Sequence, residues 1–197
     1  MGRVLVGCEE SGVVRRAFEE AGHEAWSCDL VGARDGGGQW GRHLLMDVKR
    51  AVVDCGPWDL MIAHPPCTRL ASSGARWMAG REEEINEALD LVRWLLVFQR
   101  EIDRVCVENP VGLIGTRVRP SDQIIHPWQY GHPEKKATCL WLRRLPLLRR
   151  GVIVPEWERT DRLSTLSPGV GRAAERSRTF EGIAEAMASQ WGPLIGK

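Results

Sequence analysis

Two short apolar segments of this chain are each followed by residues that could carry out chemistry. Residues 60–63 lead through two prolines to Cys67, and residues 104–107 lead to Glu108 and Asn109 before another proline. A cysteine thiolate is a nucleophile, and a carboxyl group can hold or transfer a proton. Two segments that end in such residues are more informative than either alone, and together they predict a catalytic site with a cysteine nucleophile.

The residues before Cys67 are expected to form a strand that positions it. Residues 60–63 are apolar throughout, which is typical of a parallel strand buried on both faces. Pro65 and Pro66 then end the strand, because proline has no N–H for the ladder and restricts the residue before it. Cys67 would lie at the carboxyl end of a strand, where open α/β sheets bind ligands. The alternatives are that Cys67 is simply a small buried side chain and that Glu108 is a paired or capping acid.

The first thirty residues have the pattern of a nucleotide-binding unit. A strand over residues 3–7 precedes a glycine-containing turn, a helix that begins at Val13, and a strand over residues 25–28 that leads to Asp29. Glycines at such a turn let the backbone approach a ligand, and an acid after the second strand can accept hydrogen bonds from ribose hydroxyls. We therefore expect a nucleoside-containing ligand, with Asp29 at its ribose.

The acids of this region indicate which ligand it is. Glu9 and Glu10 lie in the turn between Gly7 and Gly12, where they would repel a pyrophosphate but not a sulfonium or an ammonium group. The turn therefore favours S-adenosylmethionine over a dinucleotide. Asp47 follows another strand-like run, and two interpretations remain open for it: contact with the adenine amino group, or capping of the helix that follows.

The remaining elements predict an α/β fold. A helix is expected over residues 81–103, strands over 104–107 and 139–142, and a final helix over 178–191, while residues 32–42 have the composition of a loop. Strands that alternate with helices in this way favour a mostly parallel central sheet with helices on both faces.

Composition narrows the classes of protein that need to be considered. The 197 residues fit one domain, and 43% hydrophobic and 27% charged residues are ordinary for a globular chain. No apolar run is long enough for a membrane span and the first residues do not resemble a signal peptide, so we expect a cytoplasmic protein without a membrane partner. The six cysteines are scattered without a CxxC pair, so no metal is expected, although His64 and Cys67 have a metal-like interval.

Charge is distributed unevenly along the chain. Residues 143–178 contain nine arginines, no lysine and four acids, so this segment carries +5 and the remainder −4. Such a segment could contact phosphates, or it could be a solvated surface. Trp40, Trp77 and Trp157 lie in loop-like or polar surroundings and could stack on a base.

Four of these elements together resemble the DNA cytosine-C5 methyltransferases. That family has a glycine turn with an acid for S-adenosylmethionine, a Pro-Pro-Cys nucleophile, a Glu-Asn-Val element and a Gln-x-Arg-x-Arg element. The corresponding sequences here are VGCEESG with Asp29, HPPCT, VENP and YGHPEKKATCLWL. The resemblance spans residues 3–142 and the terminal helix. It implies a Rossmann-like S-adenosylmethionine-dependent methyltransferase fold, with DNA as the partner.

The resemblance also implies a role for each catalytic residue. The Cys67 thiolate would attack C6 of cytosine, while Glu108 would hold the base and favour protonation at N3. Glu108 would need to keep or share a proton, which a dry pocket favours, and a cytosine in a duplex would have to be flipped out. The catalytic residues implied are Cys67, Glu108, Asn109 and Lys136. The cofactor-binding residues implied are Gly7, Glu9, Ser11, Gly12, Asp29, Leu30, Asp47, Val48, His64 and Pro65.

The chain also departs from the family's pattern. The Gln-x-Arg-x-Arg positions are occupied by Glu134, Lys136 and Thr138, so the arginine expected at the base's O2 is absent, and Lys136 or a downstream arginine is the candidate replacement. Only about thirty-five residues stand where the family has its target-recognition domain.

These departures shape the expected organisation and leave two other functions open. We expect a catalytic core over residues 1–142, a short arginine-rich recognition segment over 143–175, and a C-terminal helical region over 176–197 that packs on the core. The first alternative is an amino-methyltransferase acting on adenine N6 or cytosine N4. The second is a degenerate relative that binds nucleic acid without turnover.

Overall fold

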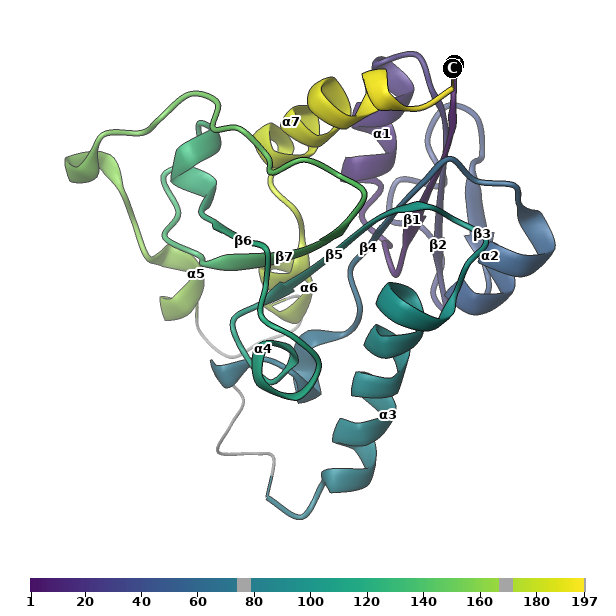
Figure 1. Ribbon diagram of the computed structural model, residues 1–197. Helices are drawn as coiled ribbons and strands as arrows, with labels where there is room; N and C mark the ends of the chain where they lie inside the picture. Colours follow the sequence, from purple (N-terminus) through teal and green to yellow (C-terminus); the bar gives the residue numbers. More distant parts are fainter. Residues whose placement is uncertain (74–78, 167–171, 197) are drawn as a thin grey trace.

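The computed structural model describes residues 1–73, 79–166 and 172–196 (Figure 1). The strands of this part are β1 (Arg3–Gly7), β2 (Glu24–Asp29), β3 (His43–Leu45), β4 (Leu60–Ala63), β5 (Arg104–Pro110), β6 (Gln123–Ile125) and β7 (Thr138–Arg143). The α-helices are α1 (Val13–Glu20), α2 (Val48–Cys55), α3 (Glu82–Arg93), α4 (Ile114–Arg117), α5 (Arg162–Thr165), α6 (Arg172–Ser177) and α7 (Glu181–Trp191). Shorter helical turns are η1 (Cys67–Arg69), η3 (Trp94–Phe98), η4 (Pro127–Tyr130), η5 (Glu156–Glu158) and η6 (Gly192–Leu194).

All seven strands of the described residues form one sheet, in the order β3-β2-β1-β4-β5-β7-β6. The five strands from β3 to β5 are parallel, whereas β7 runs antiparallel to both β5 and β6. The predicted mostly parallel sheet is therefore confirmed, and it ends in an antiparallel pair. Because β1, β2, β4 and β5 are parallel, their carboxyl ends meet at one edge of the sheet.

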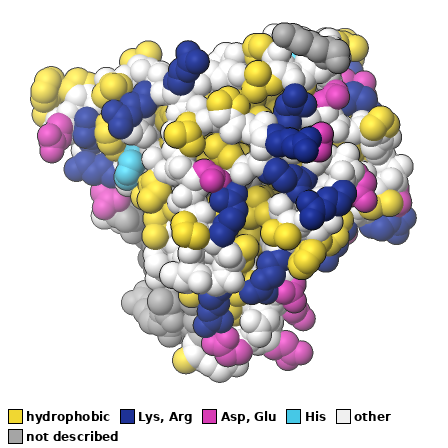
Figure 2. All heavy atoms as spheres, in the orientation of Figure 1, with side chains coloured by type: hydrophobic (Ala, Val, Ile, Leu, Met, Phe, Trp, Pro, Cys, Tyr) yellow, Lys and Arg dark blue, Asp and Glu magenta, His cyan; other side chains and the backbone are white. Residues whose placement is uncertain are grey.

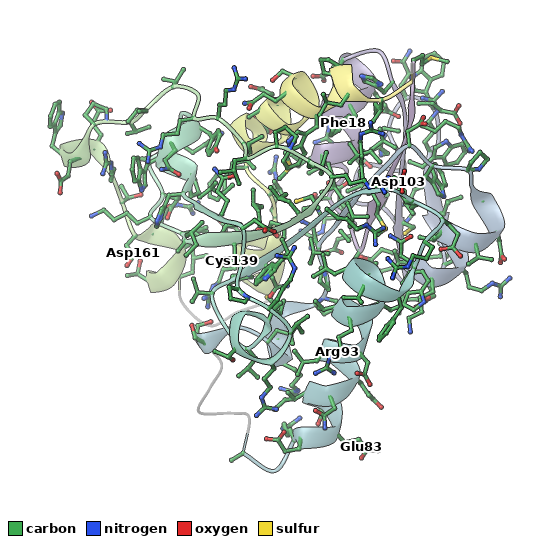
Figure 3. The ribbon with its side chains drawn as sticks, in the orientation of Figure 1. Phe18, Glu83, Arg93, Asp103, Cys139 and Asp161 are labelled. Carbon is green, nitrogen blue, oxygen red and sulfur yellow. The ribbon has the colours of Figure 1, made fainter. Side chains whose placement is uncertain are left out.

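Helices cover both faces of the sheet, and each face has its own hydrophobic core. The alternation along β1 separates them, since Val4 and Val6 belong to the core under α1 and α7, whereas Leu5 belongs to the core under α2 and α3. Figure 3 labels one member of each core, Phe18 on α1 and Cys139 on β7. The two cores fix the sheet between its helical layers, which makes its carboxyl edge a rigid platform.

The long helix predicted over residues 81–103 is shorter in the structure. Helix α3 continues into the π-helical turn η3, and residues 99–103 are not helical. The Arg143 guanidinium donates to the carbonyls of Leu96 and Gln99, both at 3.1 Å, and the Gln99 side chain bonds both the N–H and the carbonyl of Ile102. The carbonyls that would accept the hydrogen bonds of a longer helix therefore accept side-chain hydrogen bonds instead. The apolar stripe alone thus overestimates the length of helix α3.

Strand β5 is longer than the predicted residues 104–107. Its first four residues pair with β4, and Glu108, Asn109 and Pro110 continue by pairing with β7 instead. The β5–β7 ladder can extend to Pro110 because this proline is the last residue of the strand. The ladder therefore lacks only one N–H donor, that of Pro110 itself. Glu108 and Asn109 are therefore held within a ladder on a central strand and not on a loop.

The C-terminal half of the chain folds back onto the core. Helix α7 packs against α1, although it begins at Glu181 and not at the predicted residue 178. Leu148, within the predicted recognition segment, is buried in the same core as Phe18 and Met187. The segment around η5 extends away from the sheet and forms the left end of the molecule in Figure 1. The arginine-rich region is therefore anchored to the core at Leu148 and projects from the sheet around η5.

Candidate active site

Cys67 begins the turn η1 just beyond β4, at the carboxyl edge of the sheet. Its side chain is half-buried, and its carbonyl accepts hydrogen bonds from the N–H groups of Leu70 at 3.0 Å and Ala71 at 2.9 Å. Asn109 on β5 donates from Nδ2 to the Pro65 carbonyl at 2.7 Å in a buried bond. The loop that carries the thiol is thus fastened to the neighbouring strand, and the thiol remains accessible.

Glu108 lies on that same neighbouring strand, and its carboxylate interacts with Cys67. The side chain is buried, with Oε2 at 3.1 Å from Nδ1 of His64 and with a further hydrogen bond to the Thr138 side chain. Burial acts to raise the pKa of Glu108, but the bond to His64 and the nearby Lys136 ammonium outweigh it and hold the pKa below its usual value. The polar neighbours of Glu108 therefore favour its carboxylate form, whereas the sequence predicts that a dry pocket helps it to keep or share a proton.

Two cations act on the Cys67 thiol. Burial raises the pKa of the thiol and the Glu108 carboxylate adds to this, while Lys136 and Arg176 act in the opposite direction. Lys136 is positioned by a 2.8 Å hydrogen bond from Nζ to the Arg176 carbonyl on α6. A cation from the loop before β7 and a second from α6 therefore act together on the thiol, and these are the two kinds of residue that the sequence offers in place of the missing arginine.

The other two substituted positions of that element serve the fold. Glu134 is buried and accepts hydrogen bonds from the Thr160 hydroxyl and the Leu163 N–H, both at 3.3 Å. It thereby fastens the loop before β7 to the arginine-rich segment. Thr138 supports the Glu108 carboxylate. Of the three positions, only Lys136 brings a positive charge to the thiol.

The glycine turn is shaped by contacts within the protein. A Cβ on Gly7 would lie 2.6 Å from Cγ2 of the buried Val48, and Gly12 has a φ of +70° with Asp35 against its Cα. From the sequence, the close approach of a ligand is the expected reason for these glycines. In the structure Gly7 makes room for α2, and Gly12 makes room for the loop that carries Asp35.

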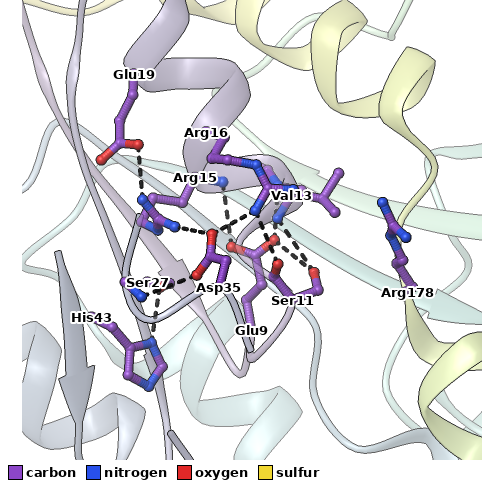
Figure 4. A network of polar contacts seen from close by, with 12 residues as sticks. Glu9, Ser11, Val13, Arg15, Arg16, Glu19, Ser27, Asp35, His43 and Arg178 are labelled. Carbon is purple, nitrogen blue, oxygen red and sulfur yellow. Dashed lines mark hydrogen bonds and ion pairs between the residues drawn. The ribbon is translucent and has the colours of Figure 1, made fainter. Parts of the chain in front are cut away.

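Glu9 also has a different neighbour from the one expected. Its buried carboxylate accepts hydrogen bonds from the N–H groups of Val14 at 2.8 Å and Arg15 at 3.3 Å, and from the Ser11 hydroxyl at 3.2 Å (Figure 4). It thus caps the first turn of α1, where the helix dipole favours an acid. Both oxygens of Glu9 thus bond within the protein, whereas the sequence predicts a place for Glu9 at the cofactor.

An ion-pair network next to this cap is not predicted by the sequence pattern. Arg15 is fully buried on α1 and pairs with Glu19 at 2.8 Å and with Asp35. Arg16 pairs with the same Asp35, so the loop over residues 32–42 is tied to the start of α1 (Figure 4). Glycine-rich composition alone indicates a flexible loop, whereas the arginines at successive positions of α1 hold it in place.

The residues expected at a nucleoside lie together beyond β1 and β2. Asp29 is half-buried with Oδ1 bonded to the Val31 N–H at 3.2 Å, and Leu30 beside it is 73% exposed. Asp29 and Asp47 both raise the pKa of the half-buried Cys8 thiol, so both approach the glycine turn. Asp47 caps α2 by accepting from the Lys49 N–H at 2.8 Å, which is one of its two interpretations. Carboxylates for ribose hydroxyls beside an exposed aliphatic side chain for a base fit a nucleoside.

Some buried polar atoms at this edge have no hydrogen-bond partner among the described residues. They include His64 Nε2 and Asn109 Oδ1. Buried polar groups are usually paired, so such atoms are candidates for bonds to a ligand. The sequence predicts His64 at the cofactor, yet its Nδ1 is directed to Glu108.

The tryptophans that could stack on a base are exposed where the structure describes them. Trp157 is 84% exposed and Trp40 is 60% exposed, while Trp77 lies outside the described residues. Among the described residues no group of three or more metal-binding side chains is found, and no helix there has the length and hydropathy to cross a membrane.

Comparison with known proteins identifies the fold. No family model matches the sequence, and no curated protein matches it. Many solved structures resemble the chain. A prophage-encoded E. coli protein, assigned as a DNA modification methyltransferase, has a TM-score of 0.51 and 16% identity, with 79% of this chain and 52% of that chain covered.

Two further similar structures are eukaryotic. The DNMT2 of Spodoptera frugiperda gives a TM-score of 0.51 and 18% identity over 79% of this chain and 56% of that chain. The Entamoeba histolytica methyltransferase EhMeth gives a TM-score of 0.53 and 15% identity, over 86% of this chain and 61% of that chain. The chain therefore spans only a little over half the length of these proteins. At such identities the similarity establishes the fold, which is the Rossmann-like fold of methyltransferases.

Proposed function

We propose that this chain transfers a methyl group from S-adenosylmethionine to C5 of cytosine in DNA. The observation that carries the proposal is the pairing of an accessible Cys67 with a buried Glu108 at one sheet edge, on adjacent parallel elements and close enough to interact electrostatically. A nucleophile next to a group that can hold the opposite side of a pyrimidine ring is the arrangement that this reaction needs.

In this proposal each residue has a defined task. The Cys67 thiolate adds to C6 of the base, which makes C5 nucleophilic. Lys136 stabilises the thiolate and the carboxylate, since its ammonium lowers the pKa of both groups. Glu108 binds the base edge at N3. Asn109 keeps the thiol in position through its bond to the Pro65 carbonyl.

S-Adenosylmethionine, when bound, would supply an electrophilic methyl group. Asp29 would hold the ribose hydroxyls and Leu30 would contact the adenine, while Gly7, Ser11, Gly12, Asp47, Val48 and Pro65 would form the surrounding wall. A half-buried carboxylate beside an exposed leucine supports this assignment. Glu9 takes part indirectly, by fixing the start of α1 next to the ligand.

DNA is the proposed substrate, and the projecting segment around η5 is the proposed contact surface. The apolar side chains of Val152 and Trp157 are exposed on it, and Figure 2 shows apolar, basic and acidic side chains together at that end of the molecule. Arg149 and Arg150 precede it, and both are exposed. By contrast, Arg143 bonds backbone carbonyls and Arg162 pairs with Glu175 at 2.6 Å, so these two serve the fold. Stacking of apolar side chains on a flipped base, together with arginine contacts to phosphates, would bind DNA with little sequence specificity.

The test is nucleoside mass spectrometry of DNA from cells that express the chain, compared with cells that express Cys67→Ala. We expect 5-methylcytosine with the wild type and none with the variant. N4-methylcytosine or N6-methyladenine would instead support an amino-methyltransferase. Unmodified DNA, together with retained binding of S-adenosylmethionine and DNA, would support a binding protein without turnover and would contradict the proposal.

A further inference from the structure

His64 occupies the position between β4 and the two prolines that precede Cys67, and its ring is joined to Glu108. Nδ1 lies 3.1 Å from Oε2 of the carboxylate, and both side chains are only 10% exposed. The other ring nitrogen, Nε2, is buried without a hydrogen-bond partner in the described part of the chain. The Glu108 carboxylate is therefore the group to which this imidazole is bonded.

The proposed reaction needs a proton at this point. When a thiolate adds to C6 of cytosine, electron density moves to N3, and a proton at N3 stabilises the adduct. Glu108 is the group that reaches N3 in the proposed function. The His64 ring at 3.1 Å and the Lys136 ammonium favour the carboxylate and hold the pKa of Glu108 below its usual value, so Glu108 needs a neighbouring group to supply the proton for N3.

We propose that His64 stores this proton and that Glu108 relays it to N3 of the base. This inference rests on the proposed function and adds a second residue to its acid catalysis. In the step, Cys67 has already lost its proton to solvent, and its sulfur forms a bond to C6. The C5–C6 double bond shifts to C4–C5, the C4–N3 double bond becomes single, and N3 takes a proton from Glu108 as Glu108 takes one from the imidazolium of His64.

The charges balance in this step. A thiolate, a neutral cytosine and an imidazolium become a neutral adduct and a neutral imidazole, while the carboxylate is unchanged. When Cys67 later leaves as a thiolate, the proton at N3 can return along the same path. His64 would therefore be needed again in every cycle.

The other titratable groups near the His64–Glu108 pair are less suited than the imidazole to supply this proton. Within the described residues, the titratable groups that interact with the Glu108 carboxylate include Lys136, Cys67, Cys106 and Cys139, besides His64 itself. Burial raises the pKa of each of these three thiols. Lys136 donates to the Arg176 carbonyl. The imidazole of His64 is the nitrogen base in direct hydrogen-bond contact with the carboxylate, at 3.1 Å, so a proton can pass between the two groups without an intermediate.

The test measures how fast the protein forms a covalent complex with duplex DNA containing 5-fluorocytosine, in the presence of S-adenosylmethionine, over a series of pH values. His64→Asn keeps an N–H close to the position of Nδ1 but cannot carry an extra proton. We expect its rate at neutral pH to fall by about 100-fold or more. The alkaline limb of its pH profile should move to lower pH, because Glu108 must then carry the proton itself.

His23→Asn is the matched control, since His23 precedes β2 at the opposite edge of the sheet and its ring accepts a bond from the Gly2 N–H. It should leave the rate and the pH profile unchanged. A His64→Asn protein with the wild-type rate and profile would overturn the inference and leave the proposed function intact. A wild type that forms no complex at any pH would contradict the proposed function itself.

A second variant covers the case in which His64→Asn does not fold. His64→Ala opens space at the ring, and added imidazole should restore complex formation, whereas the same ionic strength of sodium chloride should not. Recovery should follow the fraction of imidazole that is protonated. Absence of recovery in a folded His64→Ala protein, judged by its thermal melting, would count against the proton store.

Discussion

The bond between Asn109 and the Pro65 carbonyl offers a direct way to test how the thiol is held. Asn109 is buried, and its Nδ2 lies 2.7 Å from an oxygen whose residue is also buried. Asn109→Ala removes the donor and leaves that carbonyl without it, at a cost of about 1–3 kcal/mol. We therefore expect the free energy of unfolding in urea to fall by about that amount.

The same change should slow the reaction of Cys67. If the whole cost is felt in positioning the thiol, the rate of covalent complex formation with 5-fluorocytosine DNA should fall by between about fivefold and about 160-fold. The control is Asn86→Ala, at an exposed position of α3, which should change neither quantity appreciably. A variant Asn109→Ala with wild-type stability and wild-type rate would refute the idea that this bond holds the loop.

Two further predictions concern charge. Lys136→Met should raise the pKa of the Cys67 thiol, because the ammonium lowers it, so alkylation of Cys67 by iodoacetamide should require a higher pH. Lys135→Met, at an exposed neighbouring position, should leave that profile unchanged. Replacing Arg149 and Arg150 by serine should weaken DNA binding and reduce the slope of log K against log salt by up to about 0.9 for each phosphate that the protein no longer neutralises.

The replacement of Arg149 and Arg150 also has a matched control. Lys49 and Arg50 form a consecutive basic pair on α2, and Arg50 is 75% exposed in its side chain. Serine at both positions should not alter the salt dependence. Equal effects of the two double variants would show that DNA responds to net charge and not to the segment before η5. An unchanged alkylation profile in Lys136→Met would show that its ammonium does not act on the thiol.

The sequence predicted the parts of the site that follow from chain direction. Apolar runs that stop at prolines define strand ends, and parallel strands bring such ends to one edge, so Cys67 and Glu108 could be expected there. The pattern could not reveal that β7 is antiparallel and extends β5 through Asn109. That pairing depends on residues far apart in the chain, and local periodicity carries no information about it.

Side-chain direction was the least predictable feature. Glu9 and His64 have residue types suited to a cofactor, but a carboxylate five residues before Val14 can equally cap the helix, and an imidazole beside β4 can reach the next strand. The state of Glu108 is hard to predict for the same reason, because burial is visible in the pattern but its three polar neighbours are not. Arg143 likewise counts as surface charge in the sequence, whereas in the structure it bonds backbone carbonyls.

The proposed reaction requires a covalent bond between Cys67 and the base. Its most direct test is the intact mass of the protein after incubation with 5-fluorocytosine duplex DNA and S-adenosylmethionine, followed by denaturation and peptide mapping. We predict one protein–DNA adduct, mapped to the peptide that contains Cys67 and absent from Cys67→Ala. Recovery of the unmodified protein mass, or an adduct mapped to another cysteine, would contradict this claim.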